Sequence, residues 1–191
     1  MTDHVLHTSR LSLRQWRESD REPFAALSGD PEVMRYFPSV LSRAESDALV
    51  DRCMAAIDER GWGLWAVERD GEFLGFTGLA IPTFEADFLP TGEEKAIEVG
   101  WRFSRSAWGH GFATEAATAA LDFAFDSLGR EEVLSFTATV NVRSQRVMER
   151  LGMSRDIHAD FDHPRVPEGS ELRRHVLYRL SGLEWKLGRG A

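Results

Sequence analysis

Residues 97–116 read IEVGWRFSRSAWGHGFATEA, and this stretch decides the fold. Its first seven residues alternate between two faces, as the side chains of a β-strand do. One face carries Ile97, Val99, Trp101 and Phe103, and the other carries Glu98, Gly100 and Arg102. An alanine-rich segment with helical spacing follows, and two glycines, Gly109 and Gly111, separate the two patterns. The chain therefore passes from a strand to a helix through a loop with little side-chain cover.

The start of that helix is a candidate anion site. The first amides of a helix have no partner inside it, and the helix dipole adds positive potential there. Residues 109–114 would present these amides to a phosphate, and no lysine is needed. A tight connection without any ligand is the alternative interpretation. Two nucleotide motifs are excluded, because Gly-Lys-Ser/Thr is missing and Thr114 stands where a dinucleotide fingerprint needs glycine or alanine.

Hydrophobic periodicity predicts the other elements. We expect strands at residues 10–16, 97–103, 133–140 and 175–180, a hairpin at 62–81, helices at 21–29, 42–60, 112–128 and 142–151, a short helical turn in 31–37, and a loop at 82–95. In the first helix, Ser19 and Asp20 are candidate caps, and Phe24, Ala26 and Leu27 are expected to share one face. This order predicts a mixed α/β sheet with one crossover in its second half, in a single domain of residues 1–191.

Composition narrows the class of protein. The 191 residues carry a net charge of −8, which disfavours nucleic acid and anionic membranes as partners and mildly favours a cationic substrate. The single cysteine, Cys53, fits a reducing cytoplasm, and its place in a helical pattern indicates packing more than nucleophilic catalysis. No secretion signal or membrane span is expected. No metal site is expected either, because Asp160, Asp162 and His163 would alternate between faces.

The segment WGHGFATEA (residues 108–116) resembles the pyrophosphate loop of the GNAT N-acetyltransferase superfamily. That loop has the pattern Gln/Arg-x-x-Gly-x-Gly/Ala, and Gly111 and Ala113 match it, whereas Trp108 departs from it. Further stretches resemble the RimJ/RimL-like branch, which acetylates the N-termini of ribosomal proteins. These are RLSLRQW, GDPEVMRYF, NVRSQRVMERLGM, HVLYRL and LEW.

The resemblance implies a fold and a co-substrate. The GNAT fold has a twisted, mostly antiparallel sheet with a splayed parallel strand pair and helices on both faces. It binds acetyl-CoA, with pantetheine along the first splayed strand and pyrophosphate on the loop amides, and needs no metal. The cofactor-binding residues implied here are Trp101, Arg102, Phe103, Trp108, Gly109, His110, Gly111, Phe112, Ala113, Thr114, Asn141 and Arg146.

Acetyl transfer to an amine needs a base that keeps the amine neutral and a proton for the leaving thiolate. Glu98 is the candidate base, although a glutamate at a strand entrance can simply face solvent. Ser144 is the candidate proton donor, since residues 142–153 contain no tyrosine. Asn141 and Ser144 could instead form a helix cap, and both roles are compatible.

The acceptor side is expected to involve two aromatic residues and a polar, acidic segment. These residues are Tyr36, Phe37, Asp160, Asp162 and His163. The acidic residues would attract a cationic amine, although a solvated loop would have the same sequence. The expected reaction is acetylation of a primary amine such as a protein N-terminus. The alternatives are a small cationic amine (polyamine, aminoglycoside or amino acid) and a non-catalytic CoA-binding sensor. We expect a cytoplasmic monomer or homodimer.

Overall fold

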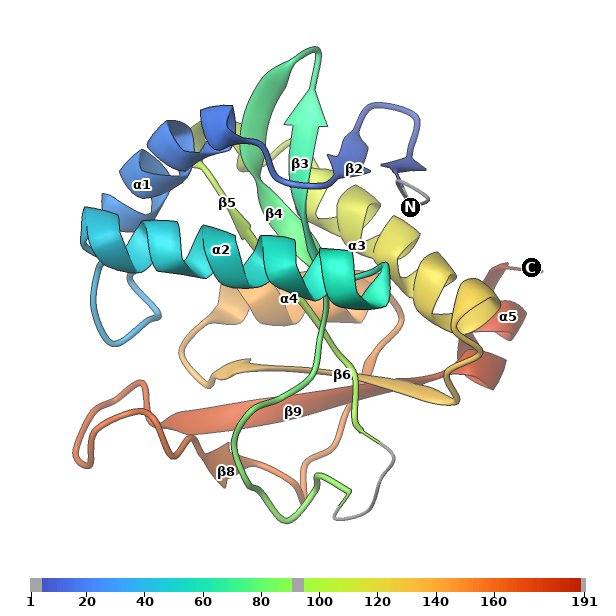
Figure 1. Ribbon diagram of the computed structural model, residues 1–191. Helices are drawn as coiled ribbons and strands as arrows, with labels where there is room; N and C mark the ends of the chain where they lie inside the picture. Colours follow the sequence, from blue (N-terminus) through green and yellow to red (C-terminus); the bar gives the residue numbers. More distant parts are fainter. Residues whose placement is uncertain (1–4, 91–94, 190–191) are drawn as a thin grey trace. The chain divides into compact units, whose positions relative to one another are not determined.

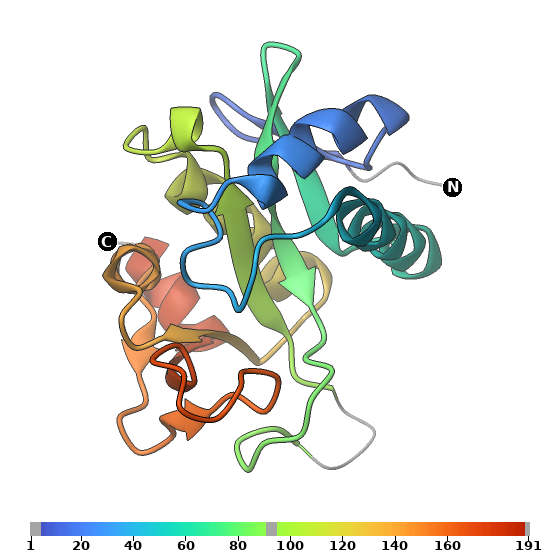
Figure 2. The same ribbon diagram turned by 90° about the vertical axis from the view of Figure 1, so that its left-hand side faces the viewer.

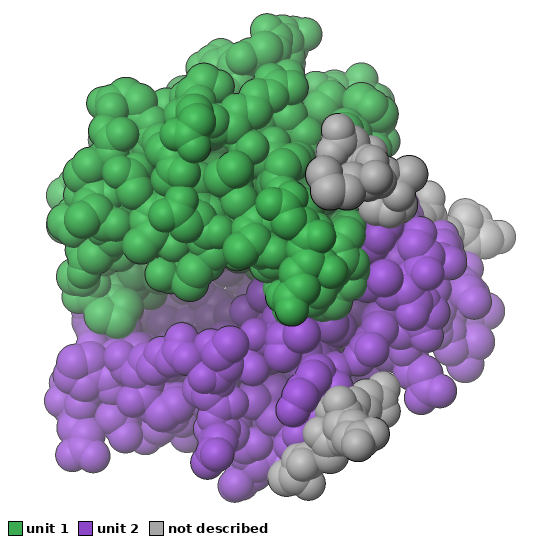
Figure 3. Space-filling model, in the orientation of Figure 1, with its two compact units in different colours: residues 1–79, 100–120 green, residues 80–99, 121–191 purple. Residues whose placement is uncertain are grey.

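The computed structural model describes residues 5–90 and 95–189, drawn in Figure 1. The chain divides into two compact units, which Figure 3 colours separately. Unit 1 comprises residues 1–79 and 100–120, and unit 2 comprises residues 80–99 and 121–191. The boundaries fall after residue 79 in β4 (Glu72–Ala80), after residue 99 in β5 (Glu98–Phe103) and after residue 120 in α3 (Phe112–Asp122).

Unit 1 is built on a run of antiparallel strands. They are β1 (Leu6–His7), β2 (Ser12–Arg14), β3 (Leu64–Arg69) and β4 (Glu72–Ala80), with β5 next to β4. The helical elements are η1 (Glu18–Asp20), α1 (Arg21–Gly29), α2 (Arg43–Arg60), η2 (Arg105–Ala107) and α3 (Phe112–Asp122). Helices α1 and α2 lie side by side in both views (Figures 1 and 2).

A core cluster explains why α1 and α2 pack on this sheet. Phe24 of α1 and Val50 of α2 are fully buried and belong to one cluster with Ala66 of β3 and Phe76 of β4. Cys53 joins the same cluster, and burial raises the pKa of its thiol to about 11. The cysteine is therefore a packing residue and not an activated nucleophile.

Unit 2 contains the parallel pair and most of the β9 ladder. Its elements are the first residues of β5, a π-helical turn (Phe123–Ser127), β6 (Glu132–Ala138), α4 (Val142–Arg150), β7 (Ser154–Arg155), β8 (Phe161–Asp162), β9 (Arg174–Ser181) and α5 (Gly182–Arg189). Strand β6 pairs antiparallel with β9 from Glu132↔Ser181 to Ala138↔His175, and β7 and β8 also pair antiparallel with β9. Strands β5 and β6 run parallel, in register at Glu98↔Leu134.

The predicted fold class is confirmed: the sheet is mostly antiparallel with one parallel pair, and helices surround it. The long helix α2 begins as expected, because Ser42 and Glu45 form a reciprocal capping box. The hairpin turns at Asp70 and Gly71, both with positive φ. The single-domain boundary of residues 1–191 stays a prediction.

Some local predictions were wrong. Residues 31–37 hold the expected single helical turn, which the Met34 amide closes by donating to the Asp30 carbonyl at 3.0 Å, but two details of α1 differ from the prediction. Ala26 is exposed, on the side of α1 away from Phe24 and Leu27. Asp20 does not cap α1 with its side chain. Its carboxylate instead binds the Arg17 amide and forms a buried ion pair with Arg14 at 2.7 Å.

Candidate active site

The loop before α3 has a backbone that only glycine adopts easily. Gly109 and Gly111 both have φ of 79°, in the left-handed region. No heavy atom lies within 4 Å of a Cβ built on Gly109, so the conformation and not crowding requires the glycine. Before the loop, the indole Nε1 of Trp108 donates to the Phe103 carbonyl at 3.0 Å. The tryptophan at this unusual motif position therefore fixes the loop to the end of β5.

The amides of residues 109–114 form an array of free donors. Helix α3 has its first bond from the Glu115 amide to the Gly111 carbonyl, at 3.0 Å. Among the described residues, none accepts a hydrogen bond from the amides of residues 109–114. Gly109, His110 and Gly111 are exposed. With the positive end of the α3 dipole, this array can bind a phosphate or a diphosphate.

Cationic and aromatic side chains surround the start of α3. The Arg10 guanidinium lies 4.8 Å from the Phe112 ring centroid, and His110 stacks on the same ring at 5.4 Å. Arg10 also forms a 2.6 Å Nε–Oε2 hydrogen bond with Glu115, and Thr8 donates to Glu115 at 2.6 Å. Burial alone would raise the pKa of Glu115. The hydrogen bonds from Thr8 and Arg10 outweigh it, so the pKa is lowered. These contacts fix the β1–β2 turn against the first turn of α3.

Glu98 lies in unit 2, at the parallel pair of strands. The Leu134 amide donates to the Ile97 carbonyl at 2.8 Å, and the Ser135 hydroxyl donates to the Val99 carbonyl at 2.9 Å. The Glu98 carboxyl is partly buried, and no donor among the described residues bonds to it. Burial raises its pKa to about 7, against the opposing charge of Arg165. A carboxyl with this pKa can exchange a proton near neutral pH.

An apolar surface lies on the same side of β6 as the Glu98 side chain. Paired residues of parallel strands project to the same side, so Glu98, Leu134 and Phe136 share a face. We call the rings around Phe136 the aromatic cluster: Phe84, Phe88, Phe136, Phe161, His163 and His175. Within it, Phe88 and Phe161 lie 4.7 Å apart and His163 and His175 lie 4.9 Å apart. This face therefore gives Glu98 apolar neighbours on its own side of the sheet.

The two histidines of the aromatic cluster are neutral at pH 7. The Nδ1 atom of His163 accepts from the Arg165 amide at 3.2 Å, so its proton is on Nε2. The Nδ1 atom of His175 lies 3.0 Å from the Arg173 carbonyl and therefore donates. Burial lowers the pKa of His163 to about 4 and also lowers that of His175. The cluster therefore presents uncharged rings.

Asn141 and Ser144 form the start of α4. The Oδ1 atom of Asn141 accepts from the Ser144 amide at 3.3 Å, so Asn141 is the N-cap. Its Nδ2 atom donates to Ser144 Oγ at 3.1 Å and to Thr137 Oγ1 at 2.9 Å. Ser144 Oγ thus accepts a hydrogen bond, and its own proton goes to no group of the described chain. The cap geometry leaves that hydroxyl available as a proton donor.

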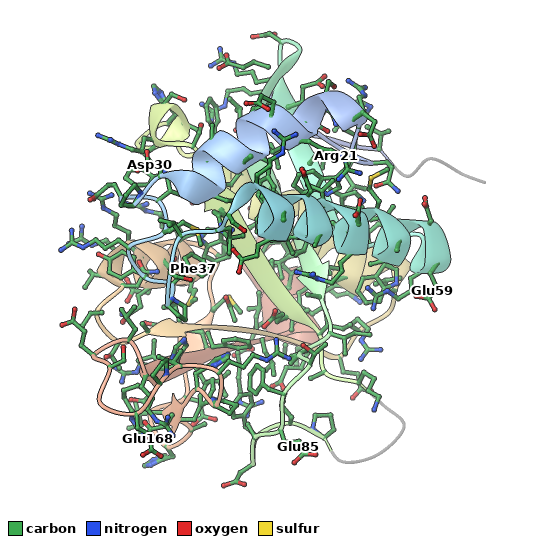
Figure 4. All side chains as sticks on the ribbon, turned by 60° about the vertical axis from the view of Figure 1, so that its left-hand side comes forward. Arg21, Asp30, Phe37, Glu59, Glu85 and Glu168 are labelled. Carbon is green, nitrogen blue, oxygen red and sulfur yellow. The ribbon has the colours of Figure 1, made fainter. Side chains whose placement is uncertain are left out.

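The predicted acidic residues are paired with arginines of the same unit. Asp160 lies 2.6 Å from Arg155, and Asp162 lies 3.3 Å from Arg174. Glu168 lies 3.8 Å from Arg173, on the segment between β8 and β9. Figure 4 labels Glu168, and it also labels Glu85 on the segment after β4. These pairs reduce the attraction that the acidic residues would exert on a cationic amine.

The other predicted site residues are distributed over both units. Unit 1 holds Tyr36, Phe37, Trp101, Arg102, Phe103, Trp108, Gly109, His110, Gly111, Phe112, Ala113 and Thr114, and unit 2 holds Glu98, Asn141, Ser144, Arg146, Asp160, Asp162 and His163. Arg146 is exposed on α4. No hydrogen bond links Glu98 to Ser144 in the part of the chain that the structure covers. The roles of these residues stay predictions.

Sequence reasoning missed four contributors. Arg10 and Glu115 tie the β1–β2 turn to the first turn of α3, Arg165 opposes the raised pKa of Glu98, and His175 completes the aromatic cluster. The pairing of Arg10 with Glu115 spans 105 positions in the chain, so no local pattern marks it. Arg165 follows the turn residue Pro164, and nothing in the local sequence indicates its electrostatic effect on Glu98.

Residues 5–90 and 95–189 contain neither a candidate metal centre nor a candidate membrane span. No group of three or more His, Cys, Asp or Glu side chains is placed to hold a metal ion. No helix there combines the length and the apolar character needed to cross a bilayer.

Comparison with known proteins gives consistent matches. The sequence profile described as "Acetyltransferase (GNAT) domain" matches residues 10–154. The chain is 31% identical to "FsC-acetyl coenzyme A-N(2)-transacetylase" of Aspergillus fumigatus over 95% of this chain and 77% of that protein. A GNAT-family acetyltransferase structure from Bacillus anthracis has a TM-score of 0.74 at 24% identity, covering 94% of this chain and 99% of the other.

A structure of RimL, a ribosomal L7/L12 alpha-N-protein acetyltransferase in complex with coenzyme A, shares the fold. Its TM-score is 0.72 at 16% identity, covering 93% of this chain and 98% of the other.

Proposed function

Because the chain belongs to the GNAT acetyltransferase family, we propose that it moves the acetyl group of acetyl-CoA directly to a primary amine. The chain is an N-acetyltransferase, and its family uses acetyl-CoA. The observation that carries the proposal is the array of free amides at residues 109–114. Amides without internal partners at the start of an 11-residue helix fit a diphosphate, which needs several donors and little side-chain bulk.

The proposed mechanism assigns one proton transfer to each catalytic residue. Bound acetyl-CoA supplies the thioester that the amine attacks. Glu98, whose pKa is raised to about 7, accepts the proton that the acceptor nitrogen loses. The C–N bond forms and the C–S bond breaks. The departing sulfur takes the Ser144 hydroxyl proton, which solvent replaces, and Glu98 releases to solvent the proton that it accepted. Asn141 fixes that hydroxyl through its Nδ2 donor.

The acceptor is proposed as an α-amine, such as a protein or peptide N-terminus. The name of the Aspergillus relative specifies acetyl transfer to an N(2) position, and the RimL title names an alpha-N-protein acceptor. A small cationic amine is the alternative, and the paired acidic side chains give it less support. The single, buried Cys53 supports a cytoplasmic location.

A thiol-release assay tests the proposal. Acetyl-CoA binding is measured by calorimetry, and release of free thiol is measured with N-terminal peptides, amino acids and polyamines. We expect binding and release with at least one α-amine. Binding without release for every acceptor would identify a sensor domain, and no binding would contradict the loop assignment.

A further inference from the structure

Arg102 is a partly buried cation, and no acidic side chain in the described parts of the chain pairs with it. Its guanidinium carbon lies 4.2 Å from the Phe37 ring centroid and 5.4 Å from that of Phe76, all within unit 1. Its one hydrogen-bond partner among the described residues is the Ser28 hydroxyl, at 3.4 Å. The Nε atom is buried and has no partner in this part of the chain.

Partial burial without an anionic partner is unfavourable for a charged guanidinium. Burial lowers the pKa of Arg102 to about 10, which the neighbouring Cys53 opposes only partly, so the side chain is still charged at pH 7. A buried charge without a partner destabilises a fold and is retained where a ligand needs it. Arg14, whose side chain is buried, shows the contrast, because Asp20 and Glu68 both pair with it.

The groups around the Arg102 guanidinium indicate which shape of anionic ligand would fit it. Two rings lie against the guanidinium, and Phe37, which is 38% exposed, forms the cover toward solvent. The unpaired Nε–H leaves a donor edge, and a guanidinium edge matches the two oxygens of a planar carboxylate. The strand alternation expected from the sequence puts Arg102 on the same side of residues 97–103 as Glu98.

We propose that the Arg102 guanidinium binds a carboxylate of the acceptor, so that the preferred acceptors are amines that also carry a carboxylate, such as amino acids or acidic peptides. The inference rests on the proposed acetyl transfer. A cofactor phosphate is the other source of negative charge, but the free amides of residues 109–114 already provide its donors. The cofactor role implied for residues 101–103 concerns the main chain and leaves the Arg102 side chain unassigned.

The first experiment measures binding without catalysis. The side-chain Nε–H signal of Arg102 is followed by NMR in the wild type, and it is assigned by its loss in Arg102→Met. N-acetylglycine supplies a carboxylate and no amine, and N-acetylglycinamide is the matched uncharged control. We expect a saturable shift with the acid and none with the amide. No shift, or equal shifts with both compounds, would overturn the proposal.

A further titration separates the two sources of negative charge. Inorganic phosphate is added to the same sample, and a shift with phosphate but not with N-acetylglycine would assign Arg102 to the cofactor and overturn the proposal. If Arg102→Met fails to fold, Phe37→Ala is the second variant. It removes only the exposed ring that lies over the Arg102 guanidinium. It should weaken binding of N-acetylglycine, and unchanged binding would contradict the proposed geometry.

The second experiment compares acceptors. Amino acids are assayed beside their carboxamides, which differ only in the charged group. In the wild type we expect kcat/KM to favour the acids by about 10- to 100-fold, and Arg102→Met should remove that preference. A preference that survives the substitution overturns the proposal. If N-acetylglycine binds but no amine is acetylated, the carboxylate site stands and the proposed acetyl transfer fails.

Discussion

Replacement of Glu98 by glutamine should stabilise the protein above neutral pH and leave its stability unchanged in acid. The folded state holds the Glu98 proton more tightly than the unfolded state, since burial raises the pKa from 4.5 to about 7. The stabilising contribution is therefore complete below pH 4.5 and is lost as pH rises through about 7. That difference corresponds to a loss of about 3 kcal/mol at higher pH. Glutamine has no proton to lose, so the variant avoids this loss.

Urea unfolding followed by tryptophan fluorescence provides the assay. The free energy of unfolding of Glu98→Gln minus that of the wild type should grow from near zero at about pH 4 to about 3 kcal/mol at about pH 8. Glu85→Gln is the matched control, because Glu85 is an exposed glutamate of the same unit (Figure 4). Its effect should remain within about 0.5 kcal/mol at every pH. A difference for Glu98→Gln that does not change with pH would refute the burial argument.

The same variant tests catalysis. As a base with a pKa of about 7, Glu98 should give a wild-type kcat/KM that rises with pH through neutrality. Glu98→Gln should lower kcat/KM about 100-fold above that pH, and the difference should shrink in acid, where the carboxyl is protonated. If the variant keeps the wild-type pH profile, another group accepts the proton.

Three further substitutions test the site and its surroundings. Gly111→Glu should weaken acetyl-CoA binding, measured by calorimetry, about 100-fold, since a carboxylate would face the phosphates. Gly129→Ala is the control: Gly129 has φ of 62° with open space around it, so the substitution causes similar backbone strain but should leave acetyl-CoA binding unchanged. Ser144→Ala should lower kcat about 100-fold with little change in the KM for acetyl-CoA; equal effects on both would make Ser144 a structural cap. The free energy of unfolding, measured in urea, should fall less for His163→Phe than for the wild type when the pH is lowered from 6.5 to about 4. The reason is that the folded state lowers the pKa of His163 from 6.5 to about 4, so protonation destabilises the wild type over this pH range. An identical acid loss in both proteins would contradict this.

Local chemistry made much of the fold predictable. The Ser42–Glu45 capping box and the Asp70-Gly71 turn are both encoded within four residues. They lie at the start of the helix expected at 42–60 and within the hairpin expected at 62–81. The glycines of the loop before α3 were also readable, since their left-handed backbone needs glycine in any context. In contrast, the two-residue strands β7 and β8 have no periodicity of their own, because pairing with β9 alone defines them.

The environment of the site residues could not be read from the chain in this way. The pKa of Glu98 depends on Arg165, which is 67 positions away in the sequence and is itself held by Thr83 through a 2.7 Å hydrogen bond. The aromatic cluster joins Phe84 to Phe136 and Phe161, from three separate segments. Sequence patterns identified residue types, but long-range packing decides their protonation and their partners.

Charge illustrates this limit most directly. A net charge of −8 favours a cationic acceptor, and Asp160 and Asp162 supported that expectation. Both carboxylates have arginine partners in the structure, so their charges are compensated before any ligand arrives. Arg102 has no acidic partner among the described residues, and its Nε donor is buried. Since a ligand responds to the charge that the fold leaves uncompensated, acceptor choice should follow this one cation more closely than the excess of acidic residues over the whole chain.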